Sequence, residues 1–341
     1  MRIQATIVCT SLVLAVSQVA AVPVSLHPDV QIRRVMDMPG ARRNSTVRMD
    51  VDRRDNTVYS ITQRGEIHRL TLAPEAGGSS AEPVFDSADH GIGGGVQGFA
   101  IGPDGSFYIS SNSGGNASNT TVGTITKGVR GPSGTVTWHT LARTVEYGRC
   151  DCIWNHQVNG LIASPDNRLL YINSGSRTDH GEVEETNGLF PGAREMPITS
   201  SILRVPTDGE NITIPNDEDA LRAGGFKYAT GFRNTFDLAY GPNGDLFATE
   251  NGPDADLPEE INWIREGRHY GFPWRFGNFT NPMSLPDYDP AQDRLINPNS
   301  TAASGNFYYN DPTFPPPPME FTDPVINLGP NADFYRDPAD G

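Results

Sequence analysis

Short apolar runs and polar turns alternate along this chain in a unit that recurs four times. Each unit has an apolar run, a turn that carries Asp or Asn, and a second apolar run. Proline presets the backbone at the second position of such a turn, and Gly or Asn accepts a positive φ near its end. Each unit therefore predicts a β-hairpin. The paired runs are residues 47–51 and 57–61, 98–101 and 106–109, 160–163 and 168–172, and 237–240 and 245–248.

Further apolar runs follow the first three hairpins, at residues 66–70, 122–126 and 201–205. Three or four antiparallel strands per repeat are typical of a β-propeller blade. An irregular β-sandwich is the alternative, but the unit recurs intact while the insertions vary, which favours the propeller. Helix is scarce, and only residues 217–223 suggest a short one. We expect an all-β fold and a single propeller domain from residue 22 to residue 341.

The first 21 residues predict a secretory signal peptide. Arg2 is their only charge, residues 7–16 are mostly apolar, and Val19-Ala20-Ala21 offers small residues for cleavage. A membrane anchor is the alternative, but the apolar run is too short for a comfortable span, and no later run approaches the ~18 apolar residues that a span needs. Glycosylation sequons agree with a secreted glycoprotein. They begin at Asn44, Asn116, Asn119, Asn211, Asn278 and Asn299.

Amino-acid composition further limits the class of protein. The 36 Gly and 28 Pro suit many short strands joined by turns. With 26 basic and 41 acidic residues the net charge is -15, which argues against a nucleic-acid partner. Cys9 belongs to the signal, and Cys150 and Cys152 leave either a local disulfide or none. The fold must therefore be stabilised by its core rather than by a disulfide framework.

Two loops that lead into predicted inner strands carry candidate chemistry. His156 precedes the third hairpin, where a side chain would face the central channel and could take a proton from a substrate hydroxyl. Arg233 and Asn234 hold the same place before the fourth hairpin and could grip a planar anionic ligand. The alternative for each is a bond to a neighbouring loop. The glycine loop 93–98 matches a dinucleotide pattern, but a strand follows it instead of a helix.

An acidic loop after the fourth hairpin suggests a cation site. Carboxylates at Asp254, Asp256, Glu259 and Glu260, with backbone carbonyls at Gly252 and Pro253, are hard oxygen ligands suited to Ca²⁺. A solvated acidic loop is the alternative. The six other histidines lack the paired spacing of zinc ligands.

The ordered motifs resemble the soluble quinoprotein sugar dehydrogenases, a group that includes glucose/sorbosone and fungal pyranose dehydrogenases. The motifs are His-x-x-Asn-Gly, Gly-Phe-Arg-Asn, Glu-Asn-Gly-Pro, Glu-Glu-Ile-Asn and Tyr-Gly-Phe-Pro, and the similarity covers about residues 40 to 275. The resemblance implies a six-bladed propeller that binds pyrroloquinoline quinone (PQQ) and Ca²⁺ and oxidises a sugar hydroxyl. It also implies an external electron acceptor, such as a cytochrome.

The resemblance assigns roles to particular residues. His156 falls on the family's general base, and Arg233 and Asn234 fall on its quinone-contacting pair. Gly252 and Pro253 fall on the carbonyls that ligate the quinone's Ca²⁺, and Glu260 and Tyr270 fall near a second calcium site. Asn155 stands where the family often has Asp, beside the quinone site. Phe236 and Gly93 replace glutamines of the bacterial members, which puts bacterial glucose specificity in doubt.

The repeats end near Tyr270, and the rest of the chain has room for one or two blades of ~40–50 residues. We therefore expect a propeller that is incomplete at its C-terminus, without the later basic residues that hold the quinone's carboxylates in this family. Two rival hypotheses remain open: a Ca²⁺-dependent lactonase-type hydrolase, and a non-catalytic propeller that binds glycans or a partner.

Overall fold

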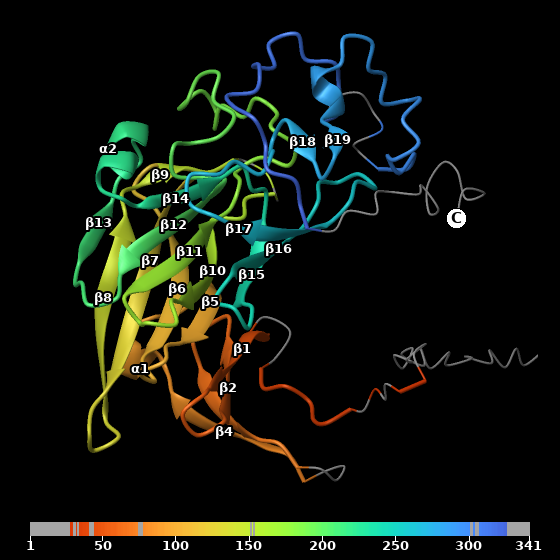
Figure 1. The fold of residues 1–341 in the computed structure, drawn as a ribbon. Helices are drawn as coiled ribbons and strands as arrows, with labels where there is room; N and C mark the ends of the chain where they lie inside the picture. The colour runs from red at the N-terminus through yellow and green to blue at the C-terminus, as the bar shows by residue number, and fades with distance from the viewer. Residues whose placement is uncertain are drawn as a thin grey trace, which may run out of the picture.

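Four mainly antiparallel β-sheets follow one another along the chain, and their first strands lie on the inner side of a curved arrangement (Figure 1). The computed structural model describes residues 28–29, 32, 34–40, 44–73, 78–150, 152, 154–300, 303 and 307–325. The predicted signal peptide and Cys9 lie outside the described residues. Within these ranges no helix is long and apolar enough to cross a membrane.

Blades 1 and 2 are the first two sheets. Blade 1 has the order β1-β2-β3-β4, and blade 2 has the order β5-β6-β7-β8, extended by β13 beside β8 and by β9 beside β7. A four-residue helix, α1 (Ser87–His90), joins the two sheets. The strands are β1 (Thr46–Asp52), β2 (Thr57–Thr62), β3 (Ile67–Thr71), β4 (Ser80–Phe85), β5 (Val96–Ile101), β6 (Phe107–Gly114), β7 (Thr120–Arg130), β8 (Val136–Thr144), β9 (Tyr147–Gly148) and β13 (Ile212–Ile214).

Blades 3 and 4 are the sheets β10-β11-β12-β14 and β15-β16-β17. Asp217 caps the predicted short helix, α2 (Glu218–Ala223). A small hairpin and one 3₁₀ turn follow blade 4. These elements are β10 (Val158–Ala163), β11 (Leu169–Ser174), β12 (Ser201–Pro206), β14 (Lys227–Thr230), β15 (Thr235–Tyr240), β16 (Leu246–Glu250), β17 (Glu260–Ile264), β18 (Arg275–Phe276), β19 (Phe279–Thr280) and η1 (Pro282–Ser284).

Apolar side chains fill the spaces between successive blades, as a propeller requires. Ile61 and Phe107 lie between blades 1 and 2, Leu170 lies with residues of blade 2, and Ile202 and Ala248 meet between blades 3 and 4. Strand alternation explains the pattern, because every second side chain points toward the neighbouring sheet. Neighbouring blades thus bury apolar faces against each other.

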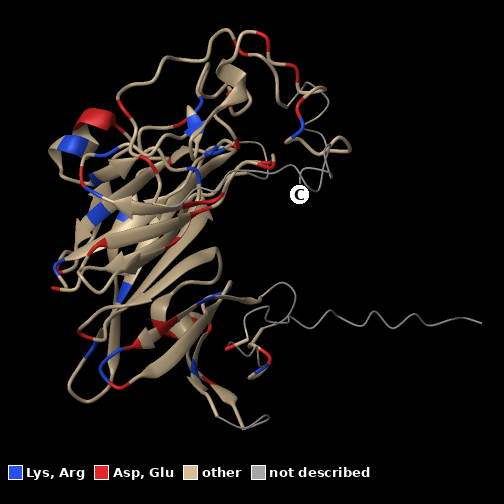
Figure 2. Ribbon diagram, turned by 45° about the vertical axis from the view of Figure 1, so that its right-hand side comes forward, with Lys and Arg blue, Asp and Glu red and all other residues tan. Residues whose placement is uncertain are grey.

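The structure confirms the all-β prediction, the four hairpins and the third strand of each of the first three repeats. The six-blade prediction is not confirmed, since the described residues form four blade-like sheets and the β18–β19 hairpin. Cys150 and Cys152 form a disulfide. Acidic and basic positions are interspersed along the described ribbon (Figure 2).

Candidate active site

The candidate residues gather at one end of the blades because of strand direction. Each blade's first strand begins at this end, and its antiparallel second strand returns to it. In blade 3 the register pairs Val158 with Ser174, and in blade 4 it pairs Thr235 with Glu250. The segments that precede β10 and β15 therefore lie beside the segments that follow β11 and β16.

His156 is held by the segment after β11. Its backbone N–H donates to the Ser176 carbonyl oxygen at 3.0 Å. Its ring Nδ1 lies 3.2 Å from the same oxygen and 3.1 Å from Ser176 Oγ. Ser176 Oγ donates its own hydrogen to the Thr178 carbonyl at 2.6 Å, so it offers His156 a lone pair.

These contacts assign the tautomer of the neutral imidazole. Both Ser176 oxygens act as acceptors, so the hydrogen sits on Nδ1 and the lone pair on Nε2. No partner of Nε2 occurs among the described residues. Burial, and secondarily the charge of Arg233, lowers the pKa of His156 to about 3. His156 is therefore neutral near pH 7, with its basic nitrogen free.

Arg233 lies next to His156 and is paired with a buried carboxylate. Its backbone carbonyl accepts from Ser176 N–H at 2.7 Å, which links the two loops. Its guanidinium donates from Nη2 to Asp179 Oδ1 at 2.5 Å, from Nε to the Asp179 carbonyl at 2.7 Å and from Nη1 to the Asn251 carbonyl at 3.3 Å. Three of its five donor hydrogens are thus used, and two remain for a ligand.

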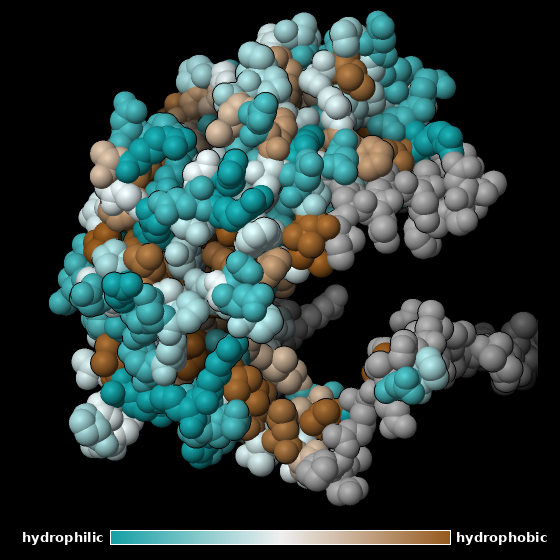
Figure 3. Space-filling view, viewed as in Figure 1, coloured by the Kyte–Doolittle hydropathy of each residue, from teal (hydrophilic) through white to brown (hydrophobic). Residues whose placement is uncertain are grey.

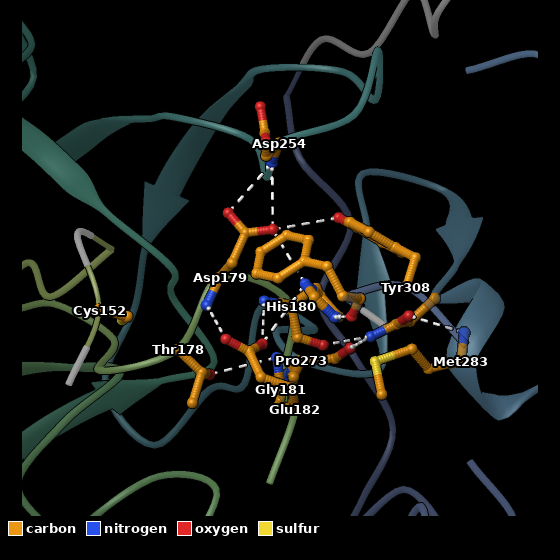
Figure 4. A network of polar contacts seen from close by, with 12 residues as sticks. Cys152, Thr178, Asp179, His180, Gly181, Glu182, Asp254, Pro273, Met283 and Tyr308 are labelled. Atoms are coloured by element: carbon orange, nitrogen blue, oxygen red, sulfur yellow. Dashed lines mark hydrogen bonds and ion pairs between the residues drawn. The ribbon is translucent and has the colours of Figure 1, made fainter. Parts of the chain in front are cut away.

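Asp179 is the centre of a buried polar network (Figure 4). Its carboxylate accepts from Tyr308 Oη at 3.2 Å and from the Asp254 N–H at 3.1 Å, and it lies 2.9 Å from His180 Nδ1. Burial alone would raise the pKa of Asp179, but the His180 hydrogen bond and the Arg233 charge lower it to about 2. The network therefore keeps a full negative charge opposite Arg233.

Asparagine side chains tie the two loops together. Asn159 Nδ2 donates to Asn234 Oδ1 at 3.0 Å, and Asn173 Nδ2 donates to Asn159 Oδ1 at 2.7 Å. The Nδ2 of Asn234 has no partner within the described ranges. Asn155 Oδ1 is buried and is also unpartnered there. Both atoms are available to a polar ligand, since a buried polar atom without a partner is costly.

Gly252 and Pro253 lie just beyond β16, after Asn251, and their carbonyls are partly available. The Pro253 oxygen accepts from Ala255 N–H at 2.7 Å, which leaves one lone pair, and the Gly252 oxygen has no partner among the described residues. No cluster of three His, Cys, Asp or Glu side chains suited to a metal ion occurs in the part of the chain that the structure covers. A cation here would depend on backbone carbonyls and a ligand's own oxygens.

The structure separates the other two predicted metal residues. Glu260 accepts from Asn262 Nδ2 at 2.8 Å and from Gly277 N–H. The Tyr270 hydroxyl instead donates to the Trp263 carbonyl at 2.5 Å and accepts from Arg265 N–H at 2.8 Å. That hydroxyl is bound to the backbone at the end of β17, so a role for Tyr270 would fall to its carbonyl.

Glu260 has a buried neighbour that sequence reasoning did not single out as a site residue. It lies directly opposite Glu250 in the β16–β17 ladder. Burial, and then the charge of Glu260, raises the pKa of Glu250 well above its usual range. Burial likewise raises the pKa of Glu260, against the hydrogen bond from Asn262. Without a cation, two adjacent buried carboxyls resist ionisation.

Ser176, Asp179 and His180 were also missed. A signal was present in the sequence, since all three follow the second strand of a predicted hairpin and so return to the start of the first strand. The position of His156 and Arg233 within their repeats made them candidates. Their partners were left out because only the segments that precede the inner strands were considered.

A comparison with protein families decides the family of this chain. The model of the family described as "Glucose / Sorbosone dehydrogenase" matches residues 65–316. The chain belongs to the glucose/sorbosone dehydrogenase family. A curated relative of this glucose/sorbosone dehydrogenase chain, "Quinoprotein glucose dehydrogenase B" from Acinetobacter calcoaceticus, is 30% identical over 132 residues. That stretch covers 35% of the present chain and 26% of the relative.

Two solved structures resemble this member of the glucose/sorbosone dehydrogenase family. The PQQ-bound aldose sugar dehydrogenase of Streptomyces coelicolor has a TM-score of 0.47 and 22% identity, covering 74% of this chain and 70% of its own. The apo soluble aldose sugar dehydrogenase of Escherichia coli has a TM-score of 0.45 and 18% identity, covering 68% and 63%. Neither overlap is close enough to support an argument about individual residues.

Proposed function

We propose that this chain is a secreted sugar dehydrogenase that depends on PQQ and Ca²⁺ and passes electrons to an external acceptor such as a cytochrome. The observation that carries the proposal is His156: a neutral imidazole with its hydrogen fixed on Nδ1 and Nε2 free, beside Arg233, in a member of the glucose/sorbosone dehydrogenase family. An imidazole nitrogen that carries a lone pair can accept the proton of a sugar hydroxyl.

The residues present fit the cofactor. The two remaining donors of Arg233 and the free Nδ2 of Asn234 would hold the quinone, with Asn155 beside them, and the carbonyls of Gly252 and Pro253 would ligate its Ca²⁺. The buried Asn155 Oδ1, which has no partner among the described residues, supports a polar ligand at this place. When bound, the quinone supplies the acceptor for the hydride that leaves the sugar carbon.

The protein's own part is to hold and move a proton. The hydroxyl proton of the sugar passes to His156 Nε2, and the resulting imidazolium keeps its Nδ1–H bond to Ser176. Asp179 takes part indirectly. It neutralises Arg233, which would otherwise oppose protonation of His156 more strongly. Asp179 also fixes the guanidinium so that its remaining donors point in constant directions.

Secretion and glycosylation belong to the same proposal. They rest on the signal-like N-terminus and on sequons at turns, of which Asn116, Asn211, Asn278 and Asn299 are exposed. Export would place the enzyme where it meets extracellular sugars and acceptors.

The test is reconstitution of the full chain with PQQ and Ca²⁺, followed by dye reduction with a panel of aldoses. Quinone-dependent reduction with at least one sugar is expected. Lactone hydrolysis without quinone would instead indicate a lactonase-type hydrolase. Glycan binding without turnover would indicate a binding propeller.

A further inference from the structure

A cavity of about 690 Å³ opens at the same end of the molecule as His156, among the first strands of blades 1, 2 and 4. Among the described residues its lining includes Arg48 and Arg64 and contains no Asp or Glu. In a chain with 41 acidic and 26 basic residues this is an unusual local balance. Arg64 also borders a second pocket, which Glu66 and Asp86 line. The space-filling view shows a wide hollow on the inner side of the curved arrangement (Figure 3).

Arg48 is a buried cation that forms no ion pair with a carboxylate of the described residues. It is 8% exposed. Its Nη2 donates to the Phe236 carbonyl at 2.8 Å and its Nη1 to the Val47 carbonyl at 3.2 Å, but its buried Nε has no partner among the described residues. Its guanidinium lies 3.9 Å from the centre of the Phe236 ring. Burial lowers the pKa of Arg48, and the charge of Asp237 only partly opposes this. Buried charges are normally paired, so an anionic partner is expected.

A glycine segment forms another wall of the cavity. Side chains at Gly93 or Gly94 would meet nothing within 4 Å, so both positions face open space. Gly95 has φ of 70°, and a Cβ there would lie 2.0 Å from the Asn112 carbonyl, so only glycine fits. The N–H groups of Gly93 and Gly94 have no partner within the described ranges, and free amides beside guanidinium groups are suited to an oxyanion.

Direct contacts join this cavity to the His156 loop. The Gly95 carbonyl accepts from Asn112 N–H at 2.9 Å. The Asn112 side chain then bonds Val158 twice, from Nδ2 to its carbonyl at 2.7 Å and from its N–H to Oδ1 at 3.2 Å. Val158 is two residues beyond His156. Three hydrogen bonds thus join the glycine wall of the cavity to the strand that the His156 loop enters.

We propose that this cavity is the subsite for the carboxylate of an acidic sugar, a hexuronate or a saccharide that ends in one. The carboxylate lies among Arg48, Arg64 and the Gly93–Gly94 amides, while the sugar ring lies against Phe236, whose side chain is 47% exposed. This proposal names the substrate class of the proposed dehydrogenase, so its claim that the ligand is a sugar rests on the proposed function. Its claim that the cavity binds an anion rests on the residues that line the cavity.

The test measures binding to the full chain without quinone, by calorimetry with D-glucuronate, D-glucose and acetate. Glucuronate is expected to bind at least about tenfold more tightly than either, because only it offers both a carboxylate and a sugar ring. Gly94→Asp should weaken glucuronate binding about tenfold or more, since it places a negative charge in the cavity. Gly94→Asn, which has nearly the same shape and no charge, should change it little. Arg64→Gln, at the exposed rim, should weaken it in the same direction as Gly94→Asp.

Three results would overturn the proposal: equal binding of glucose and glucuronate, equal binding of acetate and glucuronate, or equal effects of Gly94→Asp and Gly94→Asn. Displacement of glucuronate by PQQ would also overturn it, since the cavity would then hold the cofactor's carboxylates. Because no quinone is needed, a failed dye-reduction assay leaves this measurement valid, and failure here leaves the dehydrogenase proposal open to its own test.

Discussion

Replacing Asp179 by Asn removes one charge from the buried network while nearly keeping its shape. The Asp179 side chain is fully buried, and the carboxylate holds Arg233 at 2.5 Å and His180 at 2.9 Å. An Asn side chain would turn one N–H donor toward these donors and leave Arg233 without a counter-charge. Removing one partner of a buried ion pair is strongly destabilising, by about 3–5 kcal/mol.

The pKa of Asp179 gives a second measure of the same effect. A fall from the ordinary value of 3.8 to about 2 corresponds to roughly 2.4 kcal/mol at about 1.36 kcal/mol per pKa unit. A carboxyl whose pKa is lowered by folding stabilises the protein above its unfolded pKa, and this contribution is lost as the pH falls. We expect Asp179→Asn to lower the free energy of unfolding by about 2–5 kcal/mol at pH 7, and the difference from the parent to shrink between pH 4 and pH 2.

The assay is urea denaturation followed by tryptophan fluorescence at several pH values. Glu82→Gln is the matched control, because its ion pair with Arg69 is 61% and 50% exposed, and exposed pairs contribute about 0–1 kcal/mol. Loss of less than about 1 kcal/mol in Asp179→Asn, or a loss that does not change with pH, would refute the ion-pair account.

Four further predictions follow from particular contacts. Gly175→Ala places a Cβ 2.5 Å from His156 Cβ, so it should displace the imidazole and abolish dye reduction while the circular dichroism spectrum stays native. Gly114→Ala is the control and should behave like the parent, because a Cβ at Gly114 meets nothing within 4 Å. Folding raises the pKa of Glu250 and Glu260, so the parent should lose stability as the pH rises above 4.5, the ordinary pKa of a glutamate. Glu260→Gln should lose less stability over the same pH range, measured by urea denaturation at each pH. Added Ca²⁺ should raise the melting temperature of the parent but not of Glu260→Gln; an equal rise would remove Glu260 from the metal site. Protein secreted by a eukaryotic host should lose mass on amidase deglycosylation, and Asn278→Gln should lose one glycan by mass spectrometry.

The fold could be predicted because its signal is local and repeated. Each hairpin turn carries its own chemistry at residues 52–56, 102–105, 164–167 and 241–244, so period and turn type together indicated blades. The number of blades could not be predicted in this way. It depends on how the sheets close around the axis, which no local pattern specifies.

The candidate site was predictable only in part, for a related reason. Repeat position indicated where His156 and Arg233 lie relative to the blades. Their partners Ser176 and Asp179 come from segments that look like ordinary polar loops, and their roles depend on distances across the fold. The acidic loop shows the same limit. Glu260 accepts hydrogen bonds from Asn262 and Gly277 and lies opposite Glu250, and the composition of the loop does not specify these partners.

The most direct test of the central claim compares His156→Gln with the parent chain, both loaded with PQQ and Ca²⁺, in the initial rate of sugar-dependent dye reduction. The account predicts that the variant binds the quinone as the parent does but reduces dye about 100- to 10,000-fold more slowly, the usual contribution of a general base. An equal rate in the two proteins, or a parent rate that is the same with and without quinone, would contradict it.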